Sequence, residues 1–265
     1  MSKRIIVTGA ASGIGFEAAR QLRAKGARVV GLDLVANEDI IACDVADQAA
    51  VDTAVEQAVE RLGGLDVLIN NAGVGFPQSA GARPDGRAEK VIAINLLGPW
   101  RVTGAALPHL RASRGRVVNV SSGLAFLTVP FAPAYCMSKS GLVAYSDALR
   151  AEYGDELTVT TVYPGYIRTP IHEAGAAEGI ALEGAVPVEK VEDAAGTLVR
   201  AALGRPVRDL ATTRRGGIGY AALRVLPRRL VERGVRQQFT KQARSGAFDG
   251  SRLASDWASR VRAAK

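Results

Sequence analysis

Short runs of apolar residues alternate along the chain with longer segments in which apolar residues recur every three or four positions. The short runs predict strands at Arg4–Thr8, Arg28–Leu32, Ile40–Cys43, Asp66–Ile69, Arg116–Val120, Thr158–Val162 and, more weakly, Val207–Thr212. The longer segments predict helices at Ile14–Ala24, Ala49–Leu62, Ala88–Leu110, Ala134–Tyr153 and Val191–Leu203. Consecutive Val, Ile and Leu are typical of parallel strands covered on both faces, and alternation with helices is typical of βαβ units. The pattern therefore predicts an α/β protein with a doubly wound sheet.

Length and cysteine usage narrow the class of protein further. The chain has 265 residues, of which 48% are apolar, enough for one domain with a large core. The uncharged stretch Val117–Ser138 is long enough to span a membrane, but it contains Asn and Pro, so we interpret it as a buried strand followed by a loop. No apolar leader precedes the first strand, and Cys43 and Cys136 are isolated. We expect a cytoplasmic protein.

Charge is distributed unevenly along the chain. The net charge is +8, yet residues 205–265 hold 15 of the 34 Lys and Arg and only 4 of the 26 Asp and Glu. The basic character therefore belongs to the C-terminal quarter and does not by itself indicate nucleic acid binding. The aromatic residues of that quarter, such as Tyr220 and Trp257, are widely spaced and match no nucleic-acid-binding module. We expect no nucleic acid partner.

A glycine-rich turn lies between the first predicted strand and the first predicted helix. The segment Thr8–Gly15 reads TGAASGIG. Glycines at such a turn let backbone N–H groups approach a phosphate, and the helix N-terminus supplies partial positive charge. A purely structural turn is the alternative. Asp33 ends the second strand about 20 residues on, where a carboxylate can accept hydrogen bonds from a ribose diol, and this favours a dinucleotide site.

With three further blocks, this turn resembles the short-chain dehydrogenase/reductase family. The blocks are Asn70-Asn71-Ala72-Gly73, Ser122 with Tyr135-x-x-x-Lys139, and Pro164-Gly165 with Thr169. The resemblance covers roughly residues 3–213. It implies a Rossmann-like, mostly seven-stranded parallel sheet with helices on both faces, and hydride transfer between a nicotinamide cofactor and a secondary alcohol or ketone. We expect residues 1–213 to form the catalytic domain and 214–265 a basic helical extension that is not an independent domain.

Four residues are the candidate catalytic groups. Tyr135 and Lys139 are four apart near a helix start and share a face. An ammonium beside a phenol lowers the phenol's pKa, so we expect Tyr135 to act as a general acid/base. The family's interval to the tyrosine favours Ser122 over Ser121 as the hydroxyl that holds the substrate oxygen. The resemblance assigns Asn95 to a proton relay, where it positions a water.

The resemblance also indicates the cofactor contacts. It assigns them to Gly9, Ser12, Gly13, Ile14, Gly15, Asp33, Asp44, Val45, Asn71, Ala72, Gly73, Tyr135, Lys139, Pro164, Gly165, Ile167 and Thr169. A carboxylate at position 33 repels a 2′-phosphate and binds a 2′-hydroxyl. Positions 12 and 34, which are Ser and Leu, offer no basic residue to hold a phosphate. We therefore expect NAD, with NADP as the second choice.

The substrate and the metal content follow from weaker signals. The segments after Ser122 and at residues 74–77 are almost entirely apolar, which suits a steroid-like or lipid-like substrate, although these side chains can also pack internally. His109 and His172 are isolated, so we expect no metal. His172 lies where the family has its substrate lid and either touches substrate or is an exposed loop residue. A dinucleotide-binding regulator without turnover is the alternative function.

The last expectations concern assembly and the basic extension. The predicted helices Ala88–Leu110 and Ala134–Tyr153 match those that pair between subunits in the family, so we expect a homodimer or homotetramer. Pro227 can start a helix in which Leu230, Val231, Val235 and Phe239 lie opposite Arg229, Arg233 and Arg236. Such a helix can lie on an anionic membrane as a peripheral contact, cover the entrance for a lipophilic substrate, or dock on the protein with its arginines in water.

Overall fold

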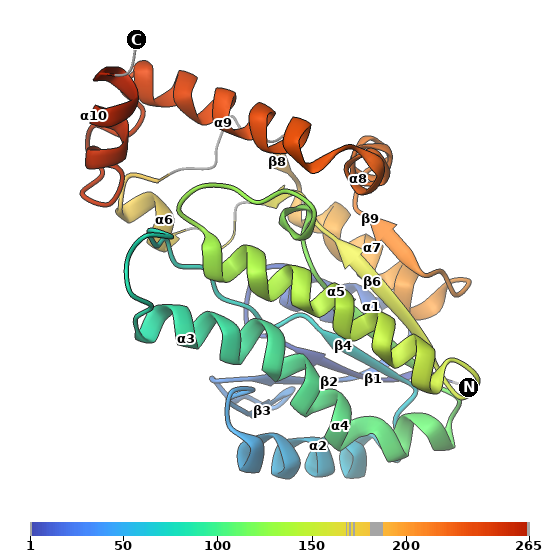
Figure 1. Ribbon diagram of the computed structural model, residues 1–265. Helices are drawn as coiled ribbons and strands as arrows, with labels where there is room; N and C mark the ends of the chain where they lie inside the picture. The colour runs from blue at the N-terminus through green and yellow to red at the C-terminus, as the bar shows by residue number, and fades with distance from the viewer. Residues whose placement is uncertain (1, 168, 170, 172, 181–187, 264–265) are drawn as a thin grey trace.

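A seven-stranded sheet forms the centre of the computed structural model, which describes residues 2–167, 169, 171, 173–180 and 188–263 (Figure 1). The strand order is β3-β2-β1-β4-β5-β6-β9, and every neighbouring pair is parallel. The predicted doubly wound, Rossmann-like sheet is therefore confirmed. The strands are β1 (Arg4–Thr8), β2 (Arg28–Asp33), β3 (Ile40–Ala42), β4 (Val67–Asn70), β5 (Arg116–Val120), β6 (Thr158–Tyr163) and β9 (Asp209–Ala211).

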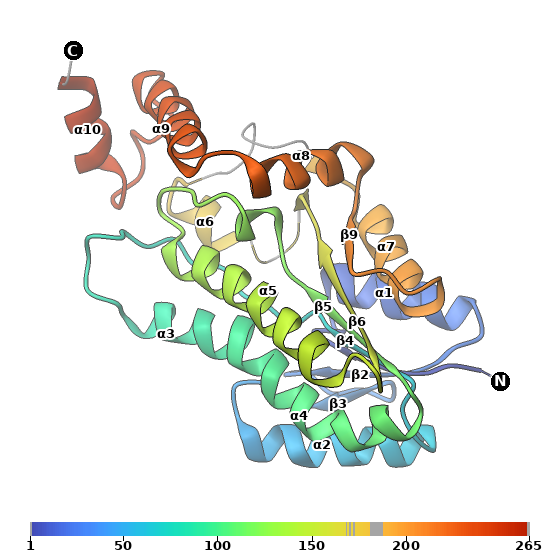
Figure 2. The same ribbon diagram turned by 45° about the vertical axis from the view of Figure 1, so that its right-hand side comes forward.

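Helices cover both faces of the sheet because each strand is apolar on both sides. Side chains of a strand alternate between faces, so Ile5 and Val7 of β1 join one core and Ile6 joins the other. The helices α1 (Gly13–Ala24) and α7 (Val191–Leu203) pack on the first face. The second face is covered by α2 (Gln48–Leu62), α4 (Gly98–Ala112) and α5 (Pro133–Tyr153). Figure 2 shows the two helical layers with the sheet between them.

The predicted helix Ala88–Leu110 is wrong as one regular element. The chain forms α3 (Gly86–Ile92), a π-helical segment over Ala93–Leu97, and α4. A π segment inserts a wider turn whose hydrogen bonds span one more residue, and no period in the sequence announces it. The stretch Val117–Ser138 contains β5, a 3₁₀ turn over Gly123–Ala125, a loop and the start of α5. Among the described residues, no helix is long and apolar enough to cross a membrane.

Three helices follow the last strand, and the second and third of them share a separate apolar core. They are α8 (Arg214–Val225), α9 (Arg228–Arg244) and α10 (Ser255–Ala263), and Pro227 is the residue before α9 begins. Phe239 of α9 is 3% exposed and packs with Phe131 and Phe248 in a third core. The second half of α9 therefore docks on the protein. Leu230, near its start, stays 54% exposed.

Two short segments complete the fold near the end of β6. The strands β7 (Tyr166–Ile167) and β8 (Val188–Glu189) pair in parallel as a small second sheet, and α6 (Glu173–Ala177) lies between them in the chain. His172, the candidate lid residue, lies outside the described residues. In a parallel sheet all carboxyl ends share one edge, and ligands bind there. Thr8, Asp33 and Asn70 end their strands at this edge.

Candidate active site

The turn between β1 and α1 can be formed only with glycine at several positions. Gly9 and Gly13 have φ of 67° and 55°, in the left-handed region that favours glycine. A Cβ at Gly15 would lie 2.0 Å from the Gly9 carbonyl oxygen and 2.5 Å from Nδ2 of Asn71. Gly15 is thus required where α1 packs against the turn and the Asn71 loop.

A cleft of about 360 Å³ opens above this turn, at the carboxyl ends of the strands. Every residue that the sequence assigned to cofactor contact lines it, except Gly15. The structure also adds residues that the sequence analysis did not assign to cofactor contact. Three of them, Leu32, Cys43 and Val120, stand at or just beyond strand ends, a position that could have identified them. The others are Leu34, Val74, Gly75, Phe76, Ile94, Ser121 and Ile171.

The start of α1 is suited to an anion. Its first-turn N–H groups receive no side-chain cap from Ser12, and the turn contains no acidic residue. By contrast, Asp47 caps α2 and Asp85 caps α3 with side-chain oxygens. Uncapped N–H groups and the helix dipole together favour a bound phosphate. The cleft therefore fits the pyrophosphate of a dinucleotide.

Hydrogen bonds fix the walls of the cleft. Thr8 Oγ1 accepts bonds from the backbone N–H groups of Asn71 and Ala72, both at 3.0 Å. Asn71 Nδ2 donates to the carbonyl oxygens of Thr8 and Gly9, at 3.1 and 3.2 Å. Asp33 accepts from the N–H of Ala11 at 2.9 Å and from that of Leu34 at 2.7 Å. These bonds hold the ends of β1, β2 and β4 in register around the glycine turn.

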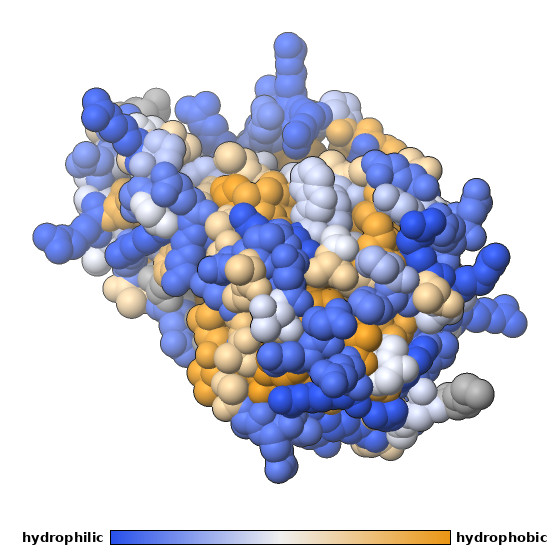
Figure 3. Space-filling model, turned by 90° about the horizontal axis from the view of Figure 1, so that it is seen from below, coloured by the Kyte–Doolittle hydropathy of each residue, from blue (hydrophilic) through white to orange (hydrophobic). Residues whose placement is uncertain are grey.

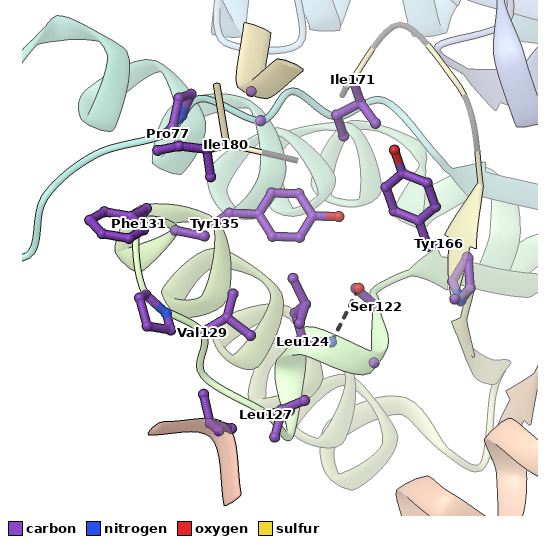
Figure 4. Close-up of a pocket in the computed structure, with 18 of the residues that line it drawn as sticks. Pro77, Ser122, Leu124, Leu127, Val129, Phe131, Tyr135, Tyr166, Ile171 and Ile180 are labelled. Carbon is purple, nitrogen blue, oxygen red and sulfur yellow. Dashed lines mark hydrogen bonds between the residues drawn. The ribbon is translucent and has the colours of Figure 1, made fainter. Parts of the chain in front are cut away.

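A second, larger cavity of about 590 Å³ adjoins the cleft (Figure 4). Ser122 and Tyr135 line both spaces and so mark their junction. Figure 4 shows the Tyr135 hydroxyl pointing toward the end of the cavity where the hydroxyls of Ser122 and Tyr166 also lie. The rest of the wall is mainly apolar and includes Phe76, Pro77, Leu124, Leu127, Val129, Phe131, Ile171, Ile180, Leu223, Val235 and Phe239.

The structure distinguishes the two serines at the end of β5. The Ser121 hydroxyl is turned away, and it donates to the carbonyl oxygen of Lys139 at 3.0 Å. Ser122 Oγ accepts from the N–H of Leu124 at 3.2 Å, which leaves its own hydrogen to be donated to another group. Ser122, and not Ser121, lies against both the cleft and the apolar cavity.

Tyr135 and Lys139 share a face of α5, but the expected lowering of the tyrosine pKa is not found. Burial raises the pKa of Tyr135 to about 12, only partly offset by a hydrogen bond with Ser122. Burial also lowers the pKa of Lys139 to about 8. The Lys139 ammonium donates to the Val120 carbonyl oxygen at 2.9 Å and lies 5.6 Å from the centre of the Tyr135 ring. Desolvation by burial therefore dominates the pKa of Tyr135.

Asn95 lies behind the cleft in the π segment. Its side chain is fully buried and exchanges two hydrogen bonds with the backbone of Val74, both at 2.8 Å. Its Nδ2 also contacts Ser138 Oγ at 3.3 Å. A Cβ at Gly73 would meet Asn95 Oδ1 at 3.4 Å and Lys139 Nζ at 3.6 Å. Asn95 thus holds the Gly73–Val74 backbone beside the lysine and does not itself line the cleft.

Helix α8 closes the apolar cavity from the C-terminal side, which the sequence did not indicate. Tyr220 and Leu223 line the cavity, and the Tyr220 ring lies so close to Gly123 that a Cβ there would be 2.5 Å from it. Arg224 fixes the helix to the sheet by an ion pair with Asp209 at 3.1 Å, and its guanidinium lies 4.7 Å from the centre of the Phe126 ring.

The remaining candidate groups are possible metal ligands and the two cysteines. Within the described ranges, no three His, Cys, Asp or Glu side chains come together to hold a metal ion. Cys43 and Cys136 are both buried and free, and burial raises the pKa of each thiol. Cys136 packs in the third core beside the apolar cavity. These cysteines are packing residues.

Comparison with known proteins identifies the family. The model of the family described as short chain dehydrogenase matches residues 3–179. Dehydrogenase/reductase SDR family member 7B of Rattus norvegicus is 35% identical over 188 residues, which cover 62% of this chain and 58% of that protein. Oxidoreductase UcpA of Escherichia coli K12 is 34% identical over 226 residues, covering 79% of this chain and 82% of UcpA.

A solved structure agrees with these sequence matches. The ligand-free aldohexose dehydrogenase of Thermoplasma acidophilum superimposes with a TM-score of 0.71 at 27% identity. The superposition covers 82% of this chain and 94% of that one. Matches in sequence and in structure thus accompany three features of the molecule: the sheet order, the glycine turn beneath the cleft, and the geometry of Ser122, Tyr135 and Lys139. The chain belongs to the short-chain dehydrogenase/reductase family.

Proposed function

We propose that the protein transfers hydride between NAD and a hydrophobic secondary alcohol or ketone. Its family supports an NAD(P)-dependent oxidoreductase that acts on CH–OH groups. One observation carries the finer proposal: the Ser122 and Tyr135 hydroxyls stand where a cleft fitted to a dinucleotide meets an apolar cavity. A substrate oxygen at that junction would lie beside both hydroxyls.

The proposed roles of the side chains follow from their contacts. When bound, the nicotinamide supplies or accepts the hydride. Ser122 donates its hydrogen to the substrate oxygen and holds it. Tyr135, a neutral phenol below a pKa of about 12, gives its proton to that oxygen during reduction and becomes a phenolate. In the oxidation direction the phenolate takes the hydroxyl proton of the alcohol and returns to the neutral phenol. The buried Lys139 ammonium stabilises the negative charge that develops on the phenol oxygen. Asn95 is a positioning residue, because it acts through the Gly73–Val74 backbone.

Cofactor choice is proposed from Asp33. Each of its carboxylate oxygens accepts one backbone hydrogen bond and retains a lone pair that can accept from a ribose hydroxyl. The same negative charge repels a 2′-phosphate, and Leu34 beside it supplies no compensating cation. We expect Asp33→Ala to lower the ratio of kcat/KM for NAD to kcat/KM for NADP. An unchanged ratio in steady-state assays would remove the support for NAD.

The apolar wall supports a hydrophobic substrate. Val129, Phe131 and Ile180 around the cavity are each at most 8% exposed, so a ligand there would meet an almost continuous apolar surface. A screen of secondary alcohols with NAD, followed by absorbance of the reduced nicotinamide, tests the proposal. We expect kcat/KM to increase with the apolar size of the alcohol. Absence of turnover with every alcohol and ketone, despite NAD binding, would favour the non-catalytic regulator.

We further propose a cytoplasmic homodimer or homotetramer. The π segment, α4 and α5 expose Leu97, Trp100 and Met137, with 36%, 59% and 62% of each side chain in solvent. Figure 3 views the molecule from the side of α2 and α4, and apolar surface is visible there between charged side chains. Peripheral contact of the basic C-terminal segment with an anionic membrane belongs to the same proposal, since that segment carries the excess positive charge.

A further inference from the structure

Helix α8 is apolar on its outer side as well as on the side that lines the cavity. Ile218 and Val225 are seven residues apart and therefore lie on the same side of the helix. Of the large apolar side chains that the structure describes, these two are the most exposed, at 74% and 82%. The exposed Ala221 and Ala222 lie between them along the chain. A helix that is apolar on both sides is normally covered on both.

The apolar surface continues past the end of α8. Leu226 is 45% exposed, and Leu230 in the first turn of α9 is 54% exposed. Between residues 216 and 227 the sequence contains a single charge, Arg224. That arginine is bound to Asp209 and to the Tyr163 hydroxyl. The outer side of α8 therefore presents about two helical turns without a free charge.

Basic side chains follow this apolar surface directly. Arg228, Arg229 and Arg233 are exposed, and within the described part of the chain none of the three forms an ion pair. Glu232 is the one acidic residue in the sequence of α9. An uncharged helical surface next to free arginines is the arrangement by which proteins bind the interface of an anionic bilayer.

We infer that this corner of the molecule is a docking surface for an anionic lipid bilayer. The corner surface consists of Ile218, Ala221, Ala222, Val225, Leu226, Arg228, Arg229, Leu230 and Arg233. The inference refines the proposed membrane contact and rests on it, but it selects different residues from those that the helical pattern of α9 had suggested. Val235 and Phe239 are not available, because they line the cavity.

A second copy of the chain fits this surface less well. A two-fold contact across the corner surface would place the arginines of one copy beside those of the other, and like charges repel. Anionic lipid head groups would instead neutralise them. On the inner sides of the same helices, Tyr220, Leu223 and Val235 line the apolar cavity. Figures 1 and 2 show α8 and α9 running one after the other along the same edge of the molecule. Docking there would bring the cavity to the bilayer that dissolves hydrophobic substrates.

Co-sedimentation of the full-length protein with large unilamellar vesicles tests the inference. The vesicles contain phosphatidylcholine with or without phosphatidylglycerol, at low and raised salt. We expect binding to the anionic vesicles alone, weakened by salt. Ile218→Asp combined with Val225→Asp should abolish it. Combined Arg228→Glu, Arg229→Glu and Arg233→Glu should weaken it about 100-fold, because each cation near an anionic surface contributes severalfold to affinity.

Matched controls change the same residue types elsewhere on the surface. Val207→Asp alters another exposed valine, and combined Lys25→Glu, Arg61→Glu and Arg83→Glu changes the net charge equally. Both should bind like the wild type. No binding by the wild type, or equal loss in controls and test variants, overturns the inference. The inference is also overturned if sedimentation velocity without vesicles shows self-association that Val225→Asp abolishes. The inactive Tyr135→Phe variant should bind vesicles normally, which separates this result from the proposed reaction.

Discussion

At the residue scale, burial sets the protonation of the proposed catalytic pair, Tyr135 and Lys139. A phenol with a pKa of about 12 holds its proton throughout the neutral range. We expect Tyr135→Phe to lower kcat between 10²- and 10⁴-fold, the usual contribution of general acid/base catalysis. NAD affinity, measured by isothermal titration calorimetry, should change little because the ring remains. A variant that retained more than about a tenth of kcat would exclude Tyr135 as the acid/base.

The second residue-scale prediction concerns pH. Burial lowers the pKa of Lys139 to about 8, so the ammonium is present below that pH and is lost as pH rises through it. Tyr135 does not titrate in this range. We expect kcat/KM for ketone reduction to be constant from pH 6 to near 8 and to fall above it. In Lys139→Gln the plateau should be lower and the fall absent. A fall that persists in this variant would assign it to another group.

At the scale of elements, the glycine turn makes a steric prediction. A Cβ at Gly15 would collide with the Gly9 carbonyl, so we expect Gly15→Ala to destabilise the fold by about 1–3 kcal/mol, as overpacking does. Gly104→Ala is the matched control, since a Cβ in this exposed position of α4 meets nothing within 4 Å. It should stabilise by about 0.5–1 kcal/mol. Thermal unfolding measures both, and equal effects would contradict the clash.

The helices and strands also differ in how well the sequence predicted them. The strands were placed within about two residues because parallel strands need continuous β-branched and aliphatic runs, which are easy to find. The cleft residues were assigned from the family resemblance, and they come together because most of them lie near strand ends that meet at one edge. The π segment was missed because Asn95 and its neighbours keep a helical pattern whether the turn is α or π. The short pair β7 and β8 carries too few residues to show a period.

The part of the cavity roof that α8 forms lay beyond sequence reasoning for a different reason. Arg224, one turn after Tyr220, binds Asp209 of β9 and so fixes the orientation of α8. In this orientation Tyr220 lines the cavity beside Gly123, a residue that is distant along the chain. Contacts of this kind depend on tertiary packing and leave no local pattern. The exposed side of α8 was missed likewise, because a helix with apolar residues on two sides has no amphipathic period.

At the scale of the whole molecule, the exposed side chains of α4 and α5 predict self-association. Trp100 stacks on Tyr145 with ring centres 5.3 Å apart and remains 59% exposed. Multi-angle light scattering should give at least twice the chain mass of 27.8 kDa at micromolar concentration. Trp100→Glu should shift the population toward monomer, whereas Val207→Glu should not. A monomeric wild type would contradict the prediction.

The cleft and the apolar cavity wall draw on different parts of the chain, and this has an evolutionary consequence. The matched family region ends at residue 179, whereas Tyr220, Leu223, Val235 and Phe239 of the cavity wall come from beyond it. The proposed reacting groups and the cleft are thus encoded in one part of the gene, and part of the apolar cavity wall in another. Recombination within the last quarter could exchange one substrate for another while the catalytic machinery stays intact. Chimaeras that join this core to C-terminal helices of relatives are therefore a natural way to redirect its specificity.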